Sequence, residues 1–119
     1  MNNEVESILY IRSANNAKES IELQKLMGEK YANHNSMSLS IIADTQASGI
    51  TPVRKQAGLQ KLIHLIEIGM IKTVLVSCLS RISRDVKEIL YFQSLLRKHN
   101  AKLIVLSDSN NRDFLRGLS

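Results

Sequence analysis

The stretch Thr73-Val74-Leu75-Val76-Ser77 decides the fold, because its centre is apolar throughout rather than alternately apolar and polar. Such a strand is typical of a parallel sheet whose two faces are both covered by helices. Two other runs of strand character precede it and one follows it: Ser7-Ile8-Leu9-Tyr10-Ile11, Leu39-Ser40-Ile41-Ile42-Ala43 and Leu103-Ile104-Val105-Leu106. The sequence therefore predicts several strands around one buried centre.

Segments of helical period separate these strands. Apolar residues recur at helical spacing from Ile21 to Tyr31, again from Ala57 to a stop at Gly69, and again from Asp85 to His99. Alternating strands and helices are typical of a largely parallel sheet with helices on both faces. We expect one α/β domain over residues 1–119, with a central sheet of four to five strands.

Length, charge and composition exclude several classes of protein. The 119 residues fit a single compact domain, and 16 Lys and Arg against 11 Asp and Glu suggest an anionic partner. No apolar run approaches the roughly 20 residues that span a bilayer, and the amino terminus does not resemble a secretory signal. The single Cys78 excludes a disulfide framework. These features predict a soluble, cytoplasmic domain with no membrane partner.

Arginines gather in the loops that follow the predicted strands. Parallel sheets place their functional residues beyond the carboxyl ends of the strands, and four of the arginines fall there: Arg12, Arg54, Arg81 and Arg84. Guanidinium groups match phosphate oxygens bidentately and stabilise the charge of a reacting phosphate. Serines lie close by, and each has an alternative role in a turn or helix cap, with Ser83 a natural cap before Arg84-Asp85: Ser13, Ser48, Ser80 and Ser83. The residue types thus predict a phosphate site and leave its nucleophile open.

Other chemistries find little support in the sequence. The three histidines are scattered, and there is no glycine-rich phosphate loop. Asp44 and Asp108 follow strands and leave open a receiver-like signalling module, but a basic rim with few carboxylates is a poor Mg²⁺ site. We expect neither a metal nor a nucleotide cofactor.

Several segments together resemble the catalytic domain of serine site-specific recombinases, the resolvase/invertase family. The resemblance covers nearly the whole chain, and its most specific part is similar to the family signature L-D-R-L-x-R-D. The segments are Tyr10-Ile11-Arg12-Ser13-Ala14, Ser20-Ile21-Glu22-Leu23-Gln24, Asp44 with Ala47-Ser48-Gly49, Gly58-Leu59, and Leu79-Ser80-Arg81-Ile82-Ser83-Arg84-Asp85.

The resemblance implies an enzyme that cuts and rejoins DNA. In this family a serine attacks the DNA phosphate, which gives a 5′-phosphoserine and a free 3′ hydroxyl without a metal or cofactor. Carried onto this chain, the nucleophile is Ser13 and the phosphate is held by Arg12, Arg81 and Arg84. The supporting residues are Gln24, Asp44, Ser48 and Arg54.

Three departures from the family pattern keep an alternative open. The family's first motif reads Tyr-x-Arg-Val-Ser, so the usual serine position holds Ala14, and Ser13 comes one residue early. Ser80 stands where the family commonly has Asp, and Gln56 stands where it has a loop arginine, so that Arg54 lies two residues further upstream. The alternative is a catalytically impaired, recombinase-like domain that binds DNA or regulates a partner recombinase.

The sequence after the last predicted strand is short. Only residues 110–119 follow the turn at Ser107-Asp108, which is too little for the long dimerisation helix and the DNA-binding module that the family carries. The resemblance therefore implies a catalytic domain that acts within a full-length homodimer or homotetramer. It also implies DNA integration, inversion or resolution, which are typical of mobile elements.

Overall fold

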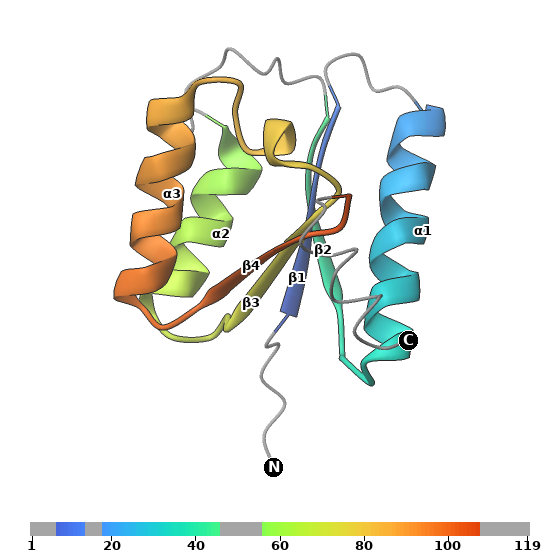
Figure 1. Ribbon diagram of the computed structural model, residues 1–119, viewed down its shortest axis with the longest axis horizontal. Helices are drawn as coiled ribbons and strands as arrows, with labels where there is room; N and C mark the ends of the chain where they lie inside the picture. The colour runs from blue at the N-terminus through green and yellow to red at the C-terminus, as the bar shows by residue number, and fades with distance from the viewer. Residues whose placement is uncertain (1–6, 14–17, 46–55, 108–119) are drawn as a thin grey trace.

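The computed structural model describes residues 7–13, 18–45 and 56–107. Its centre is a four-stranded sheet in the order β2-β1-β3-β4, in which every pair is parallel (Figure 1). The strands are β1 (Ser7–Ser13), β2 (Ser40–Thr45), β3 (Thr73–Val76) and β4 (Lys102–Val105). The predicted parallel α/β sheet is confirmed, with four strands.

Three α-helices cover the two faces of this sheet. Helix α1 (Lys18–His34) lies on one face, and α2 (Ala57–Glu67) and α3 (Val86–Lys98) lie on the other (Figure 1). A short 3₁₀ turn, η2 (Leu79–Arg81), connects β3 to α3. The sheet is therefore the middle of three layers, as the apolar strands predict.

Side chains of β1 alternate between two apolar cores. Ile8 and Tyr10 pack in the larger core with α2 and α3, whereas Leu9 and Ile11 pack in the smaller core under α1. Every residue of β1 is buried, and so are Val74, Leu75 and Val76 of β3. Burial on both faces explains why these strands are apolar runs.

Several element boundaries differ by a few residues from the sequence-based expectation, and two of them bear on the site. Strand β1 runs past Ile11 to Ser13, because the ladder with β2 continues as far as the pair Ser13 and Thr45. Helix α3 begins only at Val86, and its cap is Asp85, whose carboxylate accepts from Lys87 N at 3.0 Å. The helix cap is therefore not Ser83, whose Oγ instead accepts from Asp85 N at 3.0 Å.

The end of α2 lies where the sequence places it. Gly69 has φ +82° and donates its N–H to Ile66 O at 3.0 Å, while Met70 N donates to Leu65 O at 3.0 Å. A left-handed residue at this position is typical of a helix terminus, and glycine adopts it at low cost. Within the described ranges, no helix is long and apolar enough to span a membrane.

Candidate active site

The candidate site lies where β1 and β3 part. Strand β1 pairs with β3 only from Ser7 to Leu9, but it pairs with β2 as far as Ser13. At this point the chain order reverses, because β2 lies on one side of β1 and β3 on the other. Open α/β sheets bind ligands at such a switch point, beyond the carboxyl ends of the strands.

A side chain of α1 takes the place of the missing strand beside Arg12. The amide of Gln24 accepts from Arg12 N at 3.3 Å through Oε1 and donates to Arg12 O at 3.1 Å through Nε2. Gln24 is 1% exposed, so these two bonds satisfy backbone groups that water does not reach. The end of β1 is thus held in an extended conformation without a neighbouring strand on that side.

Main-chain carbonyls of η2 hold the side chain of Arg12. Its Nε donates to Arg81 O at 2.8 Å, and its Nη2 donates to Ser80 O. Arg12 is only 4% exposed. Ser80 stands where the family commonly has aspartate. The groups described as orienting Arg12 here are the main-chain carbonyls of Ser80 and Arg81, which any residue would supply.

Arg81 reaches from η2 across the gap to α1. Its Nη1 donates to Arg12 O at 3.1 Å, its Nε to Ser77 Oγ at 3.3 Å and its Nη2 to Ser20 Oγ at 3.4 Å. Ser20 also accepts from Gln24 Nε2 at 3.2 Å. Arg12, Gln24 and Arg81 are therefore brought together in one arrangement, which we call the arginine crevice (Arg12, Arg81, Gln24, Ser20 and Ser77).

The charge in this crevice is held by neutral oxygens. Burial lowers the pKa of Arg12; among nearby charges, Tyr10 opposes this shift, and Arg81 and Arg84 add to it. The oxygens that receive the bonds described for Arg12 and Arg81 belong to carbonyls and hydroxyls. An anion that enters the crevice would gain from charge-assisted hydrogen bonds to these guanidinium groups.

The last residue of β1 faces a different side from Arg12. Ser13 is 3% exposed, and strand alternation places it on the face of Leu9 and Ile11, under α1. Arg12 points to the η2 side, but Arg81 crosses to α1. Ser13 therefore shares a face with the Arg81 guanidinium group.

A second buried polar group lies at the same edge, around Asp44. Its Oδ2 accepts from Tyr10 Oη at 2.5 Å and from Leu59 N at 2.9 Å, and its Oδ1 accepts from Gly58 N at 2.6 Å. The carboxylate thus caps the amino terminus of α2, where the capping position itself, Gln56, makes no capping bond. We call Tyr10, Asp44, Gln56, Gly58 and Leu59 the aspartate cluster.

Gln56 joins this cluster to the turn that carries the arginines. It is 2% exposed, its Oε1 lies 3.2 Å from Tyr10 Oη, and its Nε2 donates to Ile82 O at 3.5 Å. Burial, followed by the bond to Asp44, raises the pKa of Tyr10 well above its usual range. Position 56, where the family has a loop arginine, therefore holds a buried glutamine that bonds to interior groups in this chain.

Gly58 makes room for the Asp44 carboxylate. A Cβ at Gly58 would lie 2.8 Å from Asp44 Oδ1 and 2.9 Å from both Cγ and Oδ2. These separations are shorter than ordinary van der Waals contacts. The Gly58-Leu59 pair is thus required by the close approach of the cap rather than by backbone torsion.

Cys78 lies at the junction of β3 and η2. Its Sγ is 3.1 Å from Ser80 Oγ and 4.0 Å from Ser77 Oγ. Burial alone would raise the pKa of this thiol, but the hydrogen bonds from Ser80 and Ser77 and the charge of Arg81 together lower it below its ordinary value. Sequence reasoning used Cys78 only to exclude disulfides and missed its position beside the arginines.

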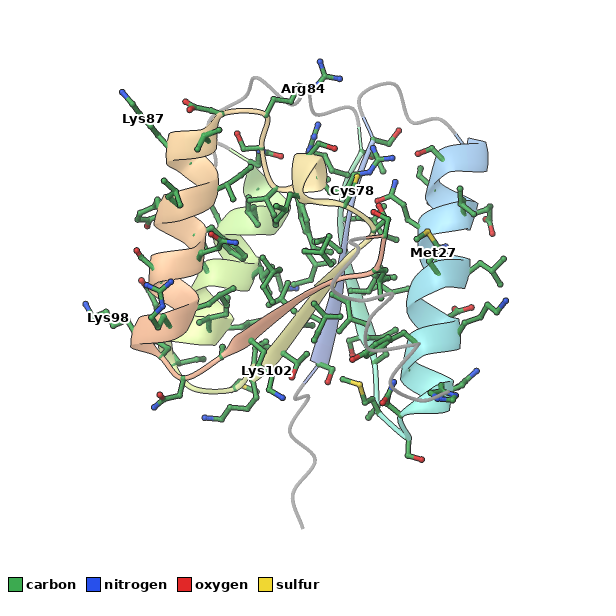
Figure 2. All side chains as sticks on the ribbon, viewed as in Figure 1. Met27, Cys78, Arg84, Lys87, Lys98 and Lys102 are labelled. Carbon is green, nitrogen blue, oxygen red and sulfur yellow. The ribbon has the colours of Figure 1, made fainter. Side chains whose placement is uncertain are left out.

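The remaining predicted residues are placed as follows. Arg84 is exposed between η2 and α3 at the upper end of the sheet, where Figure 2 labels it with Cys78 below. Ser48 and Arg54 lie outside the described residues, as do Ala14 and Asp108. In the parts of the chain that the structure describes, no group of three or more His, Cys, Asp or Glu could hold a metal ion.

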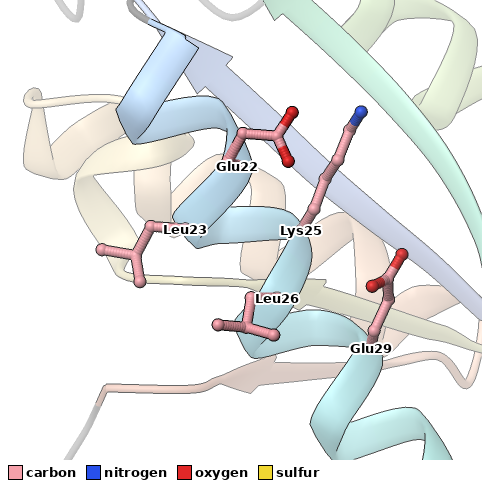
Figure 3. A pocket seen from close by; sticks show the side chains of 5 residues that line it. All are labelled: Glu22, Leu23, Lys25, Leu26 and Glu29. Atoms are coloured by element: carbon pink, nitrogen blue, oxygen red, sulfur yellow. The ribbon is translucent and has the colours of Figure 1, made fainter.

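A shallow hollow elsewhere on the surface has a different character. It lies on the outer side of α1, where Leu23 and Leu26 point away from Lys25 (Figure 3). Its lining residues are Glu22, Leu23, Lys25, Leu26 and Glu29. Two carboxylates beside one lysine disfavour a phosphate, so the crevice between β1 and β3 remains the candidate site.

Comparison with known proteins agrees with this fold. The family described as "Resolvase, N terminal domain" matches residues 7–117. A putative resolvase of Acanthamoeba polyphaga mimivirus is 36% identical over 110 residues, which are 90% of this chain and 53% of the relative. The chain therefore spans about half the length of that curated relative.

Solved structures show the same architecture. The N-terminal catalytic domain of TP901-1 integrase has 27% identity and a TM-score of 0.78, covering 95% of this chain and 98% of that one. The catalytic domain of ISC1926 TnpA, an IS607-like serine recombinase, has 24% identity and a TM-score of 0.77, covering 96% and 78%, and supports the fold alone.

A parallel sheet with an arginine crevice at its switch point defines the class as a serine recombinase catalytic domain. The chain belongs to the resolvase N-terminal domain family, whose members carry out site-specific DNA recombination.

Proposed function

We propose that this chain cuts and rejoins DNA as the catalytic domain of a site-specific recombinase. Ser13 Oγ attacks the phosphorus of a DNA phosphodiester and loses its proton. The bond from phosphorus to the 3′ oxygen breaks, the 5′ phosphate stays on Ser13, and the 3′ hydroxyl takes up a proton. The reverse attack by a 3′ hydroxyl then rejoins a strand and frees the serine.

The observation that carries this proposal is the pair of fixed guanidinium groups at the switch point. Arg12 and Arg81 are held by carbonyl and hydroxyl oxygens rather than by carboxylates in the bonds described above. Preorganised cations of this kind stabilise the charge that develops on a phosphate during displacement. Arg81 is the better placed partner for a phosphate on Ser13, because both lie on the α1 face.

The supporting residues have separate tasks in this proposal. Gln24 fixes the backbone between Arg12 and Ser13, and Arg84 is exposed where an approaching DNA strand would meet it. Asp44 acts through the start of α2 and through Tyr10 rather than by touching the phosphate. Ser48 and Arg54 are proposed as further supporting residues on the strength of the resemblance.

The partner of the domain is DNA, as the family implies. A single guanidinium crevice serves one phosphodiester at a time, and the exchange of two duplexes needs four cleaved strands. We therefore propose a homodimer that pairs into a homotetramer in the full-length protein. Action on DNA is consistent with the cytoplasmic location expected from the sequence.

Covalent trapping tests the proposal. The full-length protein is incubated with nicked duplexes tiled across the DNA that borders its gene, so that a cleaved fragment diffuses away and the adduct accumulates. We expect a protein–DNA adduct whose peptide mass places a 5′ phosphate on Ser13. Ser13→Ala should abolish the adduct, and Ser94→Ala, a change at an exposed serine of α3, should leave it intact.

Two outcomes would contradict the proposal. An adduct that persists in Ser13→Ala would assign the attack to another residue. DNA binding without any adduct in the wild-type protein would favour the catalytically impaired alternative. That alternative rests on a specific observation, since Arg12 and Ser13 point to opposite faces of β1.

A further inference from the structure

A cluster of positive charge lies at the end of the sheet opposite the arginine crevice. Two neighbouring turns form it, one leading into β3 and one connecting α3 to β4. The cations are all exposed: Lys72, Arg97, Lys98 and Lys102. We call these four residues the basic patch. Figure 2 shows Lys98 and Lys102 at the lower end of the molecule, far from Arg84 and Cys78 at the upper end.

The fold itself brings the two turns together. Thr73 of β3 is the ladder partner of Lys102 of β4, and Lys102 N donates to Lys72 O at 2.9 Å. The reversal between α3 and β4 is tight, because Ala101 N donates to Leu96 O at 2.8 Å and Asn100 adopts φ +58°. The two segments that carry the four charges are therefore held side by side by backbone geometry.

Nothing in these turns neutralises the charge. The segments 68–73 and 97–102 contain no Asp or Glu. Among the residues that the structure describes, none of the four cations is ion-paired. The nearest carboxylate along the chain is Glu67, one residue before the first of these segments.

We propose that the basic patch binds the phosphate backbone of duplex DNA at a second place, separate from the cleavage crevice. Its cations are exposed and spread over two turns, which suits a long polyanion better than a single small anion. Exposed lysines act as point charges that release counterions from DNA without reading its sequence. The choice of DNA over another polyanion rests on the proposed function; the position of the patch allows it to be occupied while the crevice holds a scissile phosphate.

The test is the salt dependence of binding by two triple variants of the chain. In the patch variant Lys72, Lys98 and Lys102 are changed to Gln. In the control variant Lys25, Lys30 and Lys61, which lie on α1 and α2, are changed to Gln. Both variants lose three positive charges, so any effect of net charge alone is the same in both.

Binding to a short fluorescent duplex of arbitrary sequence is measured by anisotropy between about 50 mM and about 200 mM salt, a range over which phosphate contacts weaken markedly. For the patch variant we expect the slope of log affinity against log salt to become shallower by about 2 to 3, because each phosphate contact contributes about 0.9. Its affinity at the lowest salt should fall at least about tenfold. The control variant should change the slope by less than about 1.

Several results would overturn the inference. If both variants lose the same amount of slope, the effect comes from net charge alone and the basic patch is not a DNA contact. An unchanged slope in the patch variant, or wild-type protein that does not bind the duplex even at the lowest salt, would exclude a DNA contact there. A patch that binds poly-glutamate but not the duplex would assign the surface to an acidic protein partner.

The salt-dependence test of the basic patch and the covalent-trapping test of the proposed function can fail independently of each other. Arg81→Gln should abolish the covalent adduct and leave the patch-dependent part of the salt slope in place. If the wild-type protein forms no adduct but the patch variant still loses slope, cleavage fails and the second DNA surface stands. If the adduct forms but the two triple variants behave alike, cleavage stands and the second surface fails.

Discussion

The aspartate cluster and the arginine crevice lie at the same edge of the sheet, yet they handle charge in opposite ways. Tyr10 and Arg12 are two residues apart on β1, and both side chains point to the α2 side. In the aspartate cluster the buried charge is Asp44, and three donors of the protein satisfy it. In the crevice the charges are the guanidinium groups of buried Arg12 and half-buried Arg81, and the bonds described for them go to neutral oxygens.

This difference separates a structural polar group from one built for a ligand. The buried Asp44 carboxylate ties β1, β2 and α2 together through its bonds to Tyr10 Oη, Gly58 N and Leu59 N. Guanidinium groups that are held in place by carbonyls and hydroxyls would stabilise an incoming phosphate, as the proposed function requires. Substitutions in the first group should therefore reduce stability, and substitutions in the second should reduce activity.

The largest effect should come from Arg81→Gln. Loss of a guanidinium group at a reacting phosphate lowers the rate of adduct formation about 10³-fold, since one such stabilising donor contributes about 3 to 4 kcal/mol to the transition state. The free energy of unfolding, measured by urea denaturation, should change by about 1 kcal/mol or less, because Arg81 is partly exposed and bonds only to neutral oxygens. A stability loss as large as that of Asp44→Ala would contradict the division between the two groups.

Asp44→Ala should have the next largest effect, now on stability. The change removes the cap of α2 and leaves the buried Tyr10 hydroxyl without its strongest acceptor, which together should lower the free energy of unfolding by about 3 kcal/mol. Asp85→Ala is the matched control, because Asp85 caps α3 at an exposed position and should lose only about 1 kcal/mol. Similar losses in the two variants would show that burial adds nothing to the role of Asp44.

Gly58→Ala tests the same comparison, because its effect on the free energy of unfolding should change sign when the Asp44 carboxylate is removed. In the wild-type background the new methyl group overlaps the Asp44 carboxylate, and we expect a loss of about 1 to 2 kcal/mol in urea denaturation. In the Asp44→Ala background the overlap is gone, and alanine should stabilise α2 by up to about 1 kcal/mol relative to glycine. Additive effects across this double-mutant cycle would mean that the clash is not with Asp44.

The smallest predicted effect is a shift in the pH dependence of Cys78 alkylation, since this thiol lies beside the arginine crevice. The rate of thiol alkylation rises with pH as the thiol loses its proton. Because the pKa of Cys78 is lowered, the midpoint of this rise should lie at a lower pH than for an ordinary cysteine. Arg81→Gln removes one cause of the shift and should move the midpoint to higher pH. Alkylation is followed by mass spectrometry, and the signal is unambiguous because the chain has a single cysteine. A midpoint that does not respond to Arg81→Gln would place the guanidinium charge outside the reach of the thiol.

The fold could be predicted from the sequence because buried strands and helix faces require apolar residues at characteristic spacings. The run Val74-Leu75-Val76 is apolar on both faces, and segments of helical period separate the strands, so a parallel sheet was the expected result. The ends of the elements were harder to predict. The end of β1 depends on its ladder with β2, and the start of α3 depends on a cap by Asp85 rather than by Ser83.

The gathering of Arg12 and Arg81 at one edge of the sheet could be predicted from the sequence, but the bonds that hold them could not. The rule for the carboxyl ends of parallel strands, together with Arg12 and Arg81, located the crevice. The groups that orient these arginines are the carbonyls of Ser80 and Arg81 and the hydroxyl of Ser77. Carbonyls are common to all residues and leave no mark in a sequence. The spacing of Ser20 and Gln24, four residues apart on α1, was the one signal that could have drawn Ser20 into the site.

The replacement of a strand by the Gln24 amide has a mechanical consequence. Backbone ladders resist shear cooperatively, because one residue cannot slip without its neighbours. On the β3 side of Arg12 the backbone is instead held by side chains, with two bonds from Gln24 of α1 and one from Arg81 Nη1. This end of β1 can therefore be released by side-chain movements of two residues, while its ladders with β2 and with β3 stay whole.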